Sequence, residues 1–513
     1  MLVRRERFLI GAILLLVLAG IAIPYLVGWG NAGKSHLFTG FLLNPQDGNS
    51  YLAKMYQGWR GDTSFTLPYS VERGEGAYLF LFYLFLGHIA RLFDTPLIAI
   101  FHLARGLSAL IMYLCLYRFL VHTFAQVHVR IFAFILASIG SGLGWIALLF
   151  GGFTSDFWVA EAYPFLSAYS NPHFPLGLAV ILVLFTFTQS RNSGLSRWLT
   201  VLLSLLLAIL LPFGMVLVLL ILAGLVVWEC YPSYSGVLRS VVFQRLAWIG
   251  LAGIPVLIYD LVVTNQDPLL KIWNSQNLTP SPPLWDLLLS LSPVLILAMV
   301  GVGAYYKSQE RSIRLLITWA ILGVLLLYIP WELQRRFILG LYIPVCALAA
   351  AGLGAMANNR RRFSLAAILI TMLVLPTNLV ILLSSAQAIH THNPQIYLSK
   401  EEADGLDWIN SQTPADATIL AAPETGLFIP AHTGRRVFYG HPYETVDAAQ
   451  QKALVTRFFG GALTKAEEGD LLAKTDYVFV GPREELIGSF TPARNLELAY
   501  ATHAVRIYQV IEP

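Results

Sequence analysis

The sequence predicts a polytopic α-helical membrane protein that ends in a soluble α/β domain. Of its 513 residues, 56% are hydrophobic and only 12% are charged, whereas about a quarter of the residues of a soluble globular protein are charged. Apolar runs at 8–27, 198–228 and 364–384 are long enough to cross about 30 Å of hydrocarbon as helices. From about residue 394 the composition becomes that of an ordinary soluble domain. We therefore expect a transmembrane domain over 1–390 and a soluble α/β domain over 391–513.

The apolar segments predict the membrane helices in order. We expect helices at 7–29, 77–93, 97–120, 130–152, 173–189, 198–211, 214–229, 245–264, 284–304, 313–329, 337–357 and 364–385. Pro212 should separate the two helices of the run at 198–229, because proline interrupts helical hydrogen bonding. The first apolar stretch lacks a small-residue cleavage site, which favours an uncleaved membrane helix over a signal peptide.

Basic residues predict the orientation of these helices. The N-terminus and the loops at 191–197, 239–245, 307–314 and 358–362 are rich in Arg and Lys, which is typical of cytoplasmic loops. We expect 30–76, 153–172, 265–283, 330–336 and the C-terminal domain on the outer face of the plasma (inner) membrane. A cytoplasmic N-terminus and an outer C-terminal domain require an odd number of crossings, and we expect 11 to 13.

The C-terminal domain alternates helical and strand-like segments. We expect helices near 400–411, 446–459 and 465–474, strands at 417–422, 435–439 and 476–480, and a closing hairpin over 497–510. The domain has no Walker motif and no dinucleotide fingerprint, and the chain has no basic stripe for nucleic acid. The three cysteines show no metal-binding spacing. Polymerase, nuclease and redox functions therefore have no support, and we expect no nucleic-acid partner.

The first outer loop carries the most informative residue, Asp47. It precedes a segment in which Tyr51, Met55 and Trp59 share one helical face, while Lys54 and neighbouring polar residues lie on the other. Such a pattern is typical of an amphipathic helix lying in the membrane interface. A carboxylate beside it could meet a substrate with a polar reactive end and a lipid tail. The alternative is a structural aspartate that caps the helix.

This layout resembles the GT-C superfamily, integral-membrane glycosyltransferases that use lipid-phosphate-linked sugars, including its bacterial and archaeal members. The resemblance covers most of the chain: a first membrane helix, a long first outer loop with Asp47 near its start, a later acidic outer loop and a closing soluble domain. It implies that Asp47 is the general base that takes a proton from the acceptor hydroxyl. No WWD-type motif and no Asp-x-Asp in an outer loop are present, so the resemblance does not fix a metal requirement.

A lipid-phosphate leaving group needs positive charge at the site. Arg335 and Arg336 open an apolar helix on the expected outer face, and arginine matches the geometry of phosphate. We expect them to bind the lipid phosphate; the alternative is an ion pair with Glu332 or a snorkelling pair.

Acidic residues on the same face could position the acceptor or a divalent cation (magnesium or manganese). The candidates are Glu72 and Glu75 before the second helix, Asp156 and Glu161 in the 153–172 loop, and His173. Each also has a structural alternative, as a solvated loop residue or a core histidine. The loop at 265–277 suits sugar hydroxyls and ring stacking, although it equally suits any interfacial loop. The segments 431–436 and 440–445 could contact the acceptor, although turn chemistry alone explains their glycines and proline.

The predicted function is therefore transfer of a sugar from a polyprenyl-phosphate donor to a glycan, lipid or protein acceptor on the outer face, by inverting direct displacement. We expect the outer loops at 30–76, 153–172 and 330–336 to form one site. Two alternatives stay open: a transporter or flippase for a lipid-linked substrate, and a non-catalytic envelope protein. A transporter would be expected to place ionisable residues near the middle of the membrane and to show internal repeats, and neither is apparent.

Overall fold

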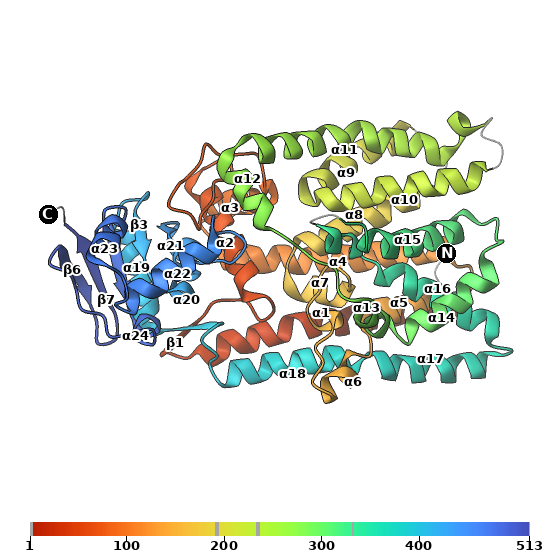
Figure 1. Cartoon of the computed structure of the whole chain (residues 1–513). Helices are drawn as coiled ribbons and strands as arrows, with labels where there is room; N and C mark the ends of the chain where they lie inside the picture. Colours follow the sequence, from red (N-terminus) through yellow and green to blue (C-terminus); the bar gives the residue numbers. More distant parts are fainter. Residues whose placement is uncertain (1–3, 190–193, 232–235, 331–332, 512–513) are drawn as a thin grey trace. The chain divides into compact units, whose positions relative to one another are not determined.

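The computed structural model describes residues 4–189, 194–231, 236–330 and 333–511. The chain divides into two compact units. Unit 1 comprises Met1–Pro24, His102–Tyr259 and Leu278–Ala386, and unit 2 comprises Tyr25–Phe101, Asp260–Asn277 and Gln387–Pro513. Unit 2 therefore joins the first outer loop to the C-terminal residues. Figure 1 labels most of the elements.

Unit 1 is helical. Its helices, four of which (α1, α4, α11 and α18) continue into unit 2, are α1 (Arg4–Ala32), α4 (Leu97–Thr123), α5 (Val127–Ile139), α6 (Gly144–Leu149), α7 (Pro164–Ser170), α8 (His173–Phe187), α9 (Gly194–Leu210), α10 (Pro212–Cys230), α11 (Val241–Gln266), α13 (Leu284–Leu291), α14 (Val294–Tyr305), α15 (Arg311–Leu327), α16 (Tyr342–Met356), α17 (Arg360–Val374) and α18 (Pro376–His390). Three short 3-10 helices complete it: η1 (Ser155–Phe157), η2 (Val237–Arg239) and η3 (Gln334–Ile338).

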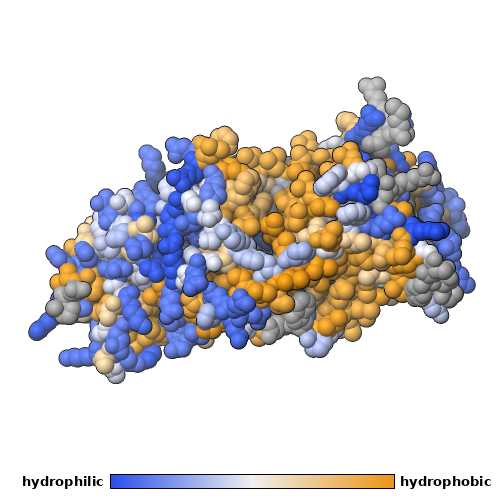
Figure 2. Space-filling view, turned by 90° about the horizontal axis from the view of Figure 1, so that it is seen from above, coloured by the Kyte–Doolittle hydropathy of each residue, from blue (hydrophilic) through white to orange (hydrophobic). Residues whose placement is uncertain are grey.

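These helices make the chain a multi-pass membrane protein. Within the described residues, seven helical stretches are long and apolar enough to cross a membrane, or eight if one bent pair counts as a span. Three shorter apolar helices, Leu81–Leu92, His173–Phe187 and Gly194–Leu210, fall below that length. Large apolar side chains such as Leu16, Leu202 and Met372 are exposed, and Figure 2 shows apolar side chains gathered over the helices. The expected 11 to 13 crossings, the inner membrane and the orientation stay predictions.

The most buried of the candidate membrane spans is the one that contains α16. Every residue from Tyr342 to Leu353 is buried, and a helix that is apolar on all sides belongs inside a bundle. Small residues let α14 approach it closely. A Cβ at Gly301 would lie 2.1 Å from the Leu348 carbonyl oxygen, and one at Gly352 would lie 2.3 Å from that of Leu297. Close backbone approach of this kind is how small residues support packing of membrane helices.

Three of the helices predicted from the sequence are interrupted in the structure, and the one expected at 364–385 divides at Leu375 into α17 and α18. The segment 130–152 ends as α5 at Ile139 and restarts as α6 at Gly144, and the segment 284–304 bends by 84° between α13 and α14. Pro293 follows the second break and cannot donate a helical hydrogen bond. Apolar runs do not reveal such breaks, because the residues on either side are equally hydrophobic. The predicted break at Pro212, between α9 and α10, is confirmed.

Unit 2 holds the sheets. Its other elements are β1 (His36–Phe38), α2 (Pro45–Arg60), α3 (Leu81–Leu92), α12 (Pro268–Gln276), β2 (Tyr397–Ser399), α19 (Lys400–Gln412), β3 (Thr418–Leu420), α20 (Pro423–Gly426), α21 (Phe428–Thr433), β4 (Arg436–Val437), α22 (Ala448–Phe459), α23 (Lys465–Leu472), β5 (Tyr477–Val480), α24 (Pro482–Glu485), β6 (Leu496–Ala501) and β7 (Arg506–Val510). The predicted helices, strands and closing hairpin from 400 onward are confirmed. The strand pair β1–β2, which is antiparallel, was not predicted.

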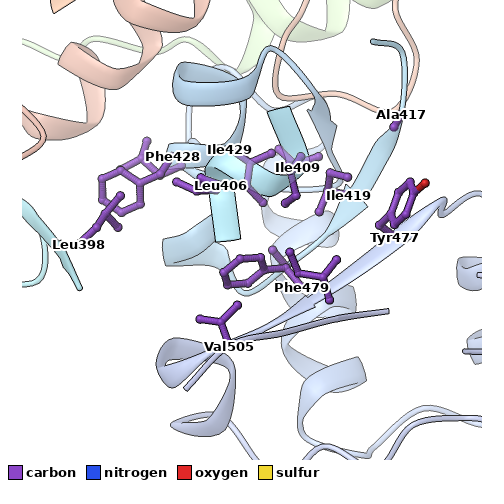
Figure 3. Packing of buried hydrophobic residues seen from close by; sticks show 14 of the residues in the cluster. Leu398, Leu406, Ile409, Ala417, Ile419, Phe428, Ile429, Tyr477, Phe479 and Val505 are labelled. Carbon is purple, nitrogen blue, oxygen red and sulfur yellow. The ribbon is translucent and has the colours of Figure 1, made fainter. Parts of the chain in front are cut away.

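The main sheet has the strand order β4-β3-β5-β7-β6. Strand β3 pairs in parallel with β4 and β5, whereas β7 is antiparallel to β5 and β6. Side chains of β5 alternate between two apolar clusters: Phe479 packs with Leu406 of α19 (Figure 3), and Val478 packs with Phe459 of α22. Helices therefore cover both faces of the sheet, as the buried strand composition of β5 predicts.

Candidate active-site residues

Asp47 lies in the first turn of α2. Asn44 adopts the left-handed conformation with φ 49° and ψ 58°, and Pro45 follows at the first helical position, where its fixed φ suits a helix start. A Cβ at Gly48 would lie 2.2 Å from the ring of Phe41, so this turn requires glycine. The Asp47 side chain is 51% exposed, and the helix dipole favours a negative charge there. The carboxylate is thus accessible and held at a defined place.

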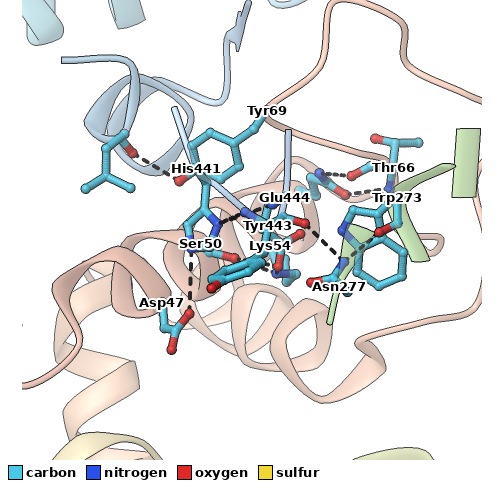
Figure 4. A network of polar contacts seen from close by, with 12 residues as sticks. Asp47, Ser50, Lys54, Thr66, Tyr69, Trp273, Asn277, His441, Tyr443 and Glu444 are labelled. Carbon is cyan, nitrogen blue, oxygen red and sulfur yellow. Dashed lines mark hydrogen bonds and ion pairs between the residues drawn. The ribbon is translucent and has the colours of Figure 1, made fainter. Parts of the chain in front are cut away.

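A histidine from the turn at 440–445 lies beside Asp47 (Figure 4). His441 Nε2 lies 3.6 Å from Asp47 Oδ1, and the histidine side chain is only 2% exposed. The other ring nitrogen, Nδ1, accepts hydrogen bonds from the backbone N–H groups of Tyr443 at 3.1 Å and Glu444 at 3.2 Å. Because these donors fix the ring in the turn, His441 lies beside Asp47 with a defined orientation.

A buried ion pair lies next to these residues. Lys54 Nζ is 2.7 Å from Glu444 Oε1, with the two side chains 0% and 12% exposed. Ser50 Oγ accepts from Lys54 at 2.6 Å and donates to Glu444 at 3.1 Å, and the ammonium lies 4.3 Å from the ring centre of Phe80. Burial alone would raise the pKa of Glu444, but the charge of Lys54, together with the hydrogen bonds from Lys54 and Ser50, outweighs burial and holds this pKa below its ordinary value.

The prediction that α2 lies on a membrane interface with its polar face in water is wrong. Lys54 is fully buried and Gln57 is 4% exposed. Gln57 Nε2 donates to the Thr66 carbonyl at 2.8 Å, and Arg60 Nη1 donates to the Gly434 carbonyl at 3.2 Å. The polar face of α2 therefore packs against polar groups of unit 2. An amphipathic pattern is the same for both situations, so the sequence could not distinguish them.

The loop at 265–277 fixes the 440–445 turn. Asp267 caps α12 by accepting from the backbone of Leu269 and Leu270. At the other end of α12, Gln276 Nε2 donates to the Thr445 carbonyl, and Asn277 Nδ2 donates to the Tyr443 carbonyl at 3.1 Å. The amide nitrogens of Gln276 and Asn277 thus already donate to the turn. Their expected contact with sugar hydroxyls stays a prediction.

Glu72 and Glu75 lie on an exposed segment between α2 and α3. Their neighbour Arg73 has a guanidinium nitrogen 3.9 Å from Asp62. The described residues provide no contact that brings either glutamate to Asp47. Their role in positioning the acceptor or a cation stays a prediction.

In unit 1, Glu161 holds the two predicted arginines. Arg335 Nε lies 3.7 Å and Arg336 Nη1 lies 3.4 Å from Glu161 Oε1, and Glu161 is 5% exposed. The Arg335 guanidinium also lies 4.8 Å from the ring centre of Trp158. One carboxylate therefore faces two guanidinium groups. The alternative partner Glu332 lies outside the described residues.

Asp156 is buried and serves the break between α5 and α6. Its Oδ2 accepts from the backbone N–H groups of Gly142 at 3.1 Å and Gly144 at 3.0 Å, and its Oδ1 accepts from Thr154 at 2.6 Å. Burial raises the pKa of Asp156, and the bonds from Thr154 and Gly144 oppose this rise. These contacts explain Asp156 as the group that replaces lost helical bonds. A role toward the acceptor stays a prediction.

His173 begins α8 and is also buried. Its ring centre lies 4.2 Å from that of Phe174. This environment suits the core-histidine alternative, and its role toward a ligand stays a prediction.

Sequence reasoning missed Asp286. This residue of α13 accepts from the backbone N–H and the hydroxyl of Ser155, at 2.8 Å and 2.9 Å, and from Ser290 at 2.7 Å. A single carboxylate inside the apolar segment 284–291 was the available signal, because charges in membrane segments need partners. Among the residues that the structure describes, no three His, Cys, Asp or Glu side chains form a group that could hold a metal ion.

Comparison with known proteins rests on structure, because no protein-family model matches the sequence and no curated protein matches it. The archaeal oligosaccharyltransferase AglB from Archaeoglobus fulgidus, in complex with an inhibitory peptide and a dolichol-phosphate, matches with a TM-score of 0.57 and 13% identity over 94% of this chain and 70% of that one. An A. fulgidus oligosaccharyltransferase tethered to an acceptor peptide matches with a TM-score of 0.52 and 14% identity, over 91% and 69%.

A bacterial structure matches over nearly its full length. ArnT from Cupriavidus metallidurans bound to undecaprenyl phosphate gives a TM-score of 0.51 at 13% identity, over 96% of this chain and 97% of that one. These neighbours are GT-C glycosyltransferases. At such low identity the likeness concerns the fold, and it shows that this chain has the fold of the GT-C membrane glycosyltransferases.

Proposed function

We propose that this protein is a membrane glycosyltransferase that moves a sugar from a polyprenyl-phosphate donor to an acceptor on the outer face of the membrane. The observation that carries the proposal is Asp47: a half-exposed carboxylate held at the start of α2 beside a buried histidine, in a chain with the GT-C fold. The neighbours bound to dolichol-phosphate and to undecaprenyl phosphate support the donor class.

The proposed reaction is a single displacement. The acceptor hydroxyl oxygen bonds to the anomeric carbon of the donor sugar while the bond from that carbon to the phosphate oxygen breaks. The hydroxyl proton passes to Asp47, and the electron pair of the broken bond leaves with the polyprenyl phosphate. Attack from the face opposite the leaving group inverts the anomeric centre. Asp47 acts as general base, for which an accessible, ionised carboxylate is required.

The phosphate needs positive charge, which Arg335 and Arg336 supply in this proposal. Both lie beside the carboxylate of Glu161, which holds the two guanidinium groups close together. A lipid phosphate would accept charge-assisted hydrogen bonds from them. Glu161 then holds the guanidinium groups in place, which refines its predicted role in positioning the acceptor.

Glu72 and Glu75 keep the proposed role of meeting the acceptor or a divalent cation, because both are exposed. Dependence on magnesium or manganese is part of the test below. The acceptor class, whether glycan, lipid or protein, is left to the same assay.

The test uses the purified full chain in proteoliposomes with a panel of radiolabelled polyprenyl-phosphate sugars and envelope acceptors, with and without EDTA. We expect label to move from the lipid to an acceptor, with inversion at the anomeric carbon. Movement of intact labelled lipid across the bilayer without any covalent product would instead establish the flippase alternative. Binding of lipid phosphate with neither product nor transport would support the non-catalytic alternative.

A further inference from the structure

The two ring nitrogens of His441 have different tasks. Nδ1 accepts from the backbone N–H groups of Tyr443 and Glu444, so it carries no proton. In a neutral imidazole the proton must then be on Nε2. The backbone of the turn therefore fixes the tautomer, and the N–H of His441 is the one that faces Asp47.

This N–H is a buried donor. Nε2 of His441 has no hydrogen-bond partner among the described residues, and Asp47 Oδ1 lies 3.6 Å away. Leaving a buried donor unsatisfied costs roughly 1–3 kcal/mol. A movement of about 0.7 Å would bring the two atoms to ordinary hydrogen-bond distance. Asp47 can make this movement because its side chain is half exposed, whereas His441 is buried.

The turn that carries His441 is fixed independently of Asp47. The backbone N–H groups of Gly440 and His441 both lie 3.3 Å from Thr445 Oγ1, and Thr445 N–H donates back to the His441 carbonyl at 3.1 Å. A Cβ at Gly440 would lie 2.3 Å from the Gly426 carbonyl oxygen, so the chain passes too closely for any side chain there. The histidine is thus held in place independently of Asp47, and its Nε2–H can orient the carboxylate.

We propose that His441 is a positioning residue: its Nε2–H donates to Asp47 and holds that carboxylate ionised and aimed at the acceptor hydroxyl. The inference rests on the proposed function, in which Asp47 is the base. Hydrogen bonds that act in catalysis are often long in an empty site and shorten when substrate binds. The turn of unit 2 is in this way a part of the catalytic machinery.

Two substitutions separate this role from a structural one. The amide oxygen of His441→Asn can replace Nδ1 as the acceptor inside the turn, but nothing replaces the Nε2–H. The amide nitrogen of His441→Gln can replace the Nε2–H, but the acceptor inside the turn is lost. His503→Asn, the same substitution at an exposed histidine outside this turn, serves as the matched control.

If His441 positions Asp47, His441→Asn keeps the thermal midpoint and KM but lowers kcat about 100-fold, the scale of a 1 Å misplacement. The acid limb of its pH profile moves to higher pH, because the carboxylate loses a donor that favours its ionised form. His441→Gln is less stable yet retains more kcat. If the role of the histidine is only structural, the order of kcat is reversed: His441→Asn is as active as wild type and more active than His441→Gln. That result overturns the inference.

A second measurement does not depend on turnover. In ¹⁵N-histidine NMR of the full chain in nanodiscs, we expect a resonance of a protonated Nε2 and an unprotonated Nδ1 that disappears in His441→Gln and shifts in Asp47→Asn. An Nε2 resonance that Asp47→Asn leaves unchanged overturns the inference, whatever the activity. A shifted resonance in a wild-type protein that transfers no sugar leaves the contact standing and refutes the proposed function instead.

Discussion

Replacing Lys54 with methionine removes one partner of the buried ion pair in unit 2. Lys54 is fully buried, Glu444 is 12% exposed, and their charged atoms lie 2.7 Å apart. Removing one member of a buried pair leaves an uncompensated charge and costs about 3–5 kcal/mol. We take the lower figure of about 3 kcal/mol, because Ser50 still donates to Glu444 at 3.1 Å. For a unit of roughly 200 residues this lowers the thermal midpoint by about 6–12 °C.

The assay is the thermal midpoint of the purified full chain in detergent, for Lys54→Met, Glu444→Leu and the double variant. The double variant should be more stable than Lys54→Met, because two apolar side chains bury without an unpaired charge. Lys400→Met, which breaks an exposed pair with Asp404, is the control and should change the midpoint little. A Lys54→Met midpoint equal to that of the control would refute the reasoning.

The dependence of stability on pH provides an independent test of the Lys54–Glu444 pair. The pKa of Glu444 lies below its ordinary value, so the stabilisation it brings is present above the pKa of the unfolded chain and is lost as the pH falls through the lower folded value. Without Lys54, burial is the largest remaining influence and raises the pKa of Glu444. In Lys54→Met the contribution of Glu444 to the stability of the folded protein should therefore fall as the pH rises. The same dependence of the thermal midpoint on pH in wild type and Lys54→Met would contradict this account.

Two further predictions concern the arginines beside Glu161 and the buried histidine His432. Arg335→Lys keeps the charge but loses the planar fork of donors, so polyprenyl phosphate should bind about tenfold more weakly in an equilibrium titration. The control Arg314→Lys, elsewhere in unit 1, should bind as wild type. Equal weakening in both variants would refute a specific site. Burial lowers the pKa of His432 to about 4, so the unfolded chain, with an ordinary value of about 6.5, binds a proton that the folded chain does not. Stability should fall by roughly 3 kcal/mol as the pH drops from 6.5 to 4, and His432→Phe should remove this part of the pH dependence of the thermal midpoint; an unchanged dependence would contradict it.

Periodicity was sufficient for the fold of the C-terminal residues. Strand β5 is a continuous apolar run and α19 follows a serine that caps it through a capping box with Glu402, so local patterns specify both elements. The membrane helices followed from hydropathy for the same reason. Hydropathy alone did not reveal the breaks at α5–α6 and α13–α14. The glycine-rich segment at 140–144 was the sequence signal for the first break, but the contact that supports it, Asp156 accepting from glycine N–H groups, appears only when the loops fold together.

The sequence indicated which residues belong to the candidate site, but it did not indicate which side chains lie beside them. Asp47 stood out by its place after the first membrane helix, and Arg335 by its charge at the expected outer face. Their partners lie far away in sequence: His441 beside Asp47, and Glu161 beside Arg335. The same distance hid the burial of Lys54, since nothing local indicates that a lysine on a polar helical face will meet a glutamate 390 residues later.

The measurement that tests the central claim most directly is sugar transfer by Asp47→Asn beside Asp62→Asn. Both variants remove one carboxylate charge from the segment between the first two membrane helices, but Asp62 pairs with Arg60 and has no proposed part in the chemistry. We expect Asp62→Asn to transfer label from polyprenyl-phosphate sugar at the wild-type rate. Asp47→Asn should lose at least a hundredfold in kcat, the scale of a missing general base, while its fold and its affinity for lipid phosphate persist. A folded Asp47→Asn protein that transfers sugar as fast as wild type would contradict the assignment of Asp47 as the base.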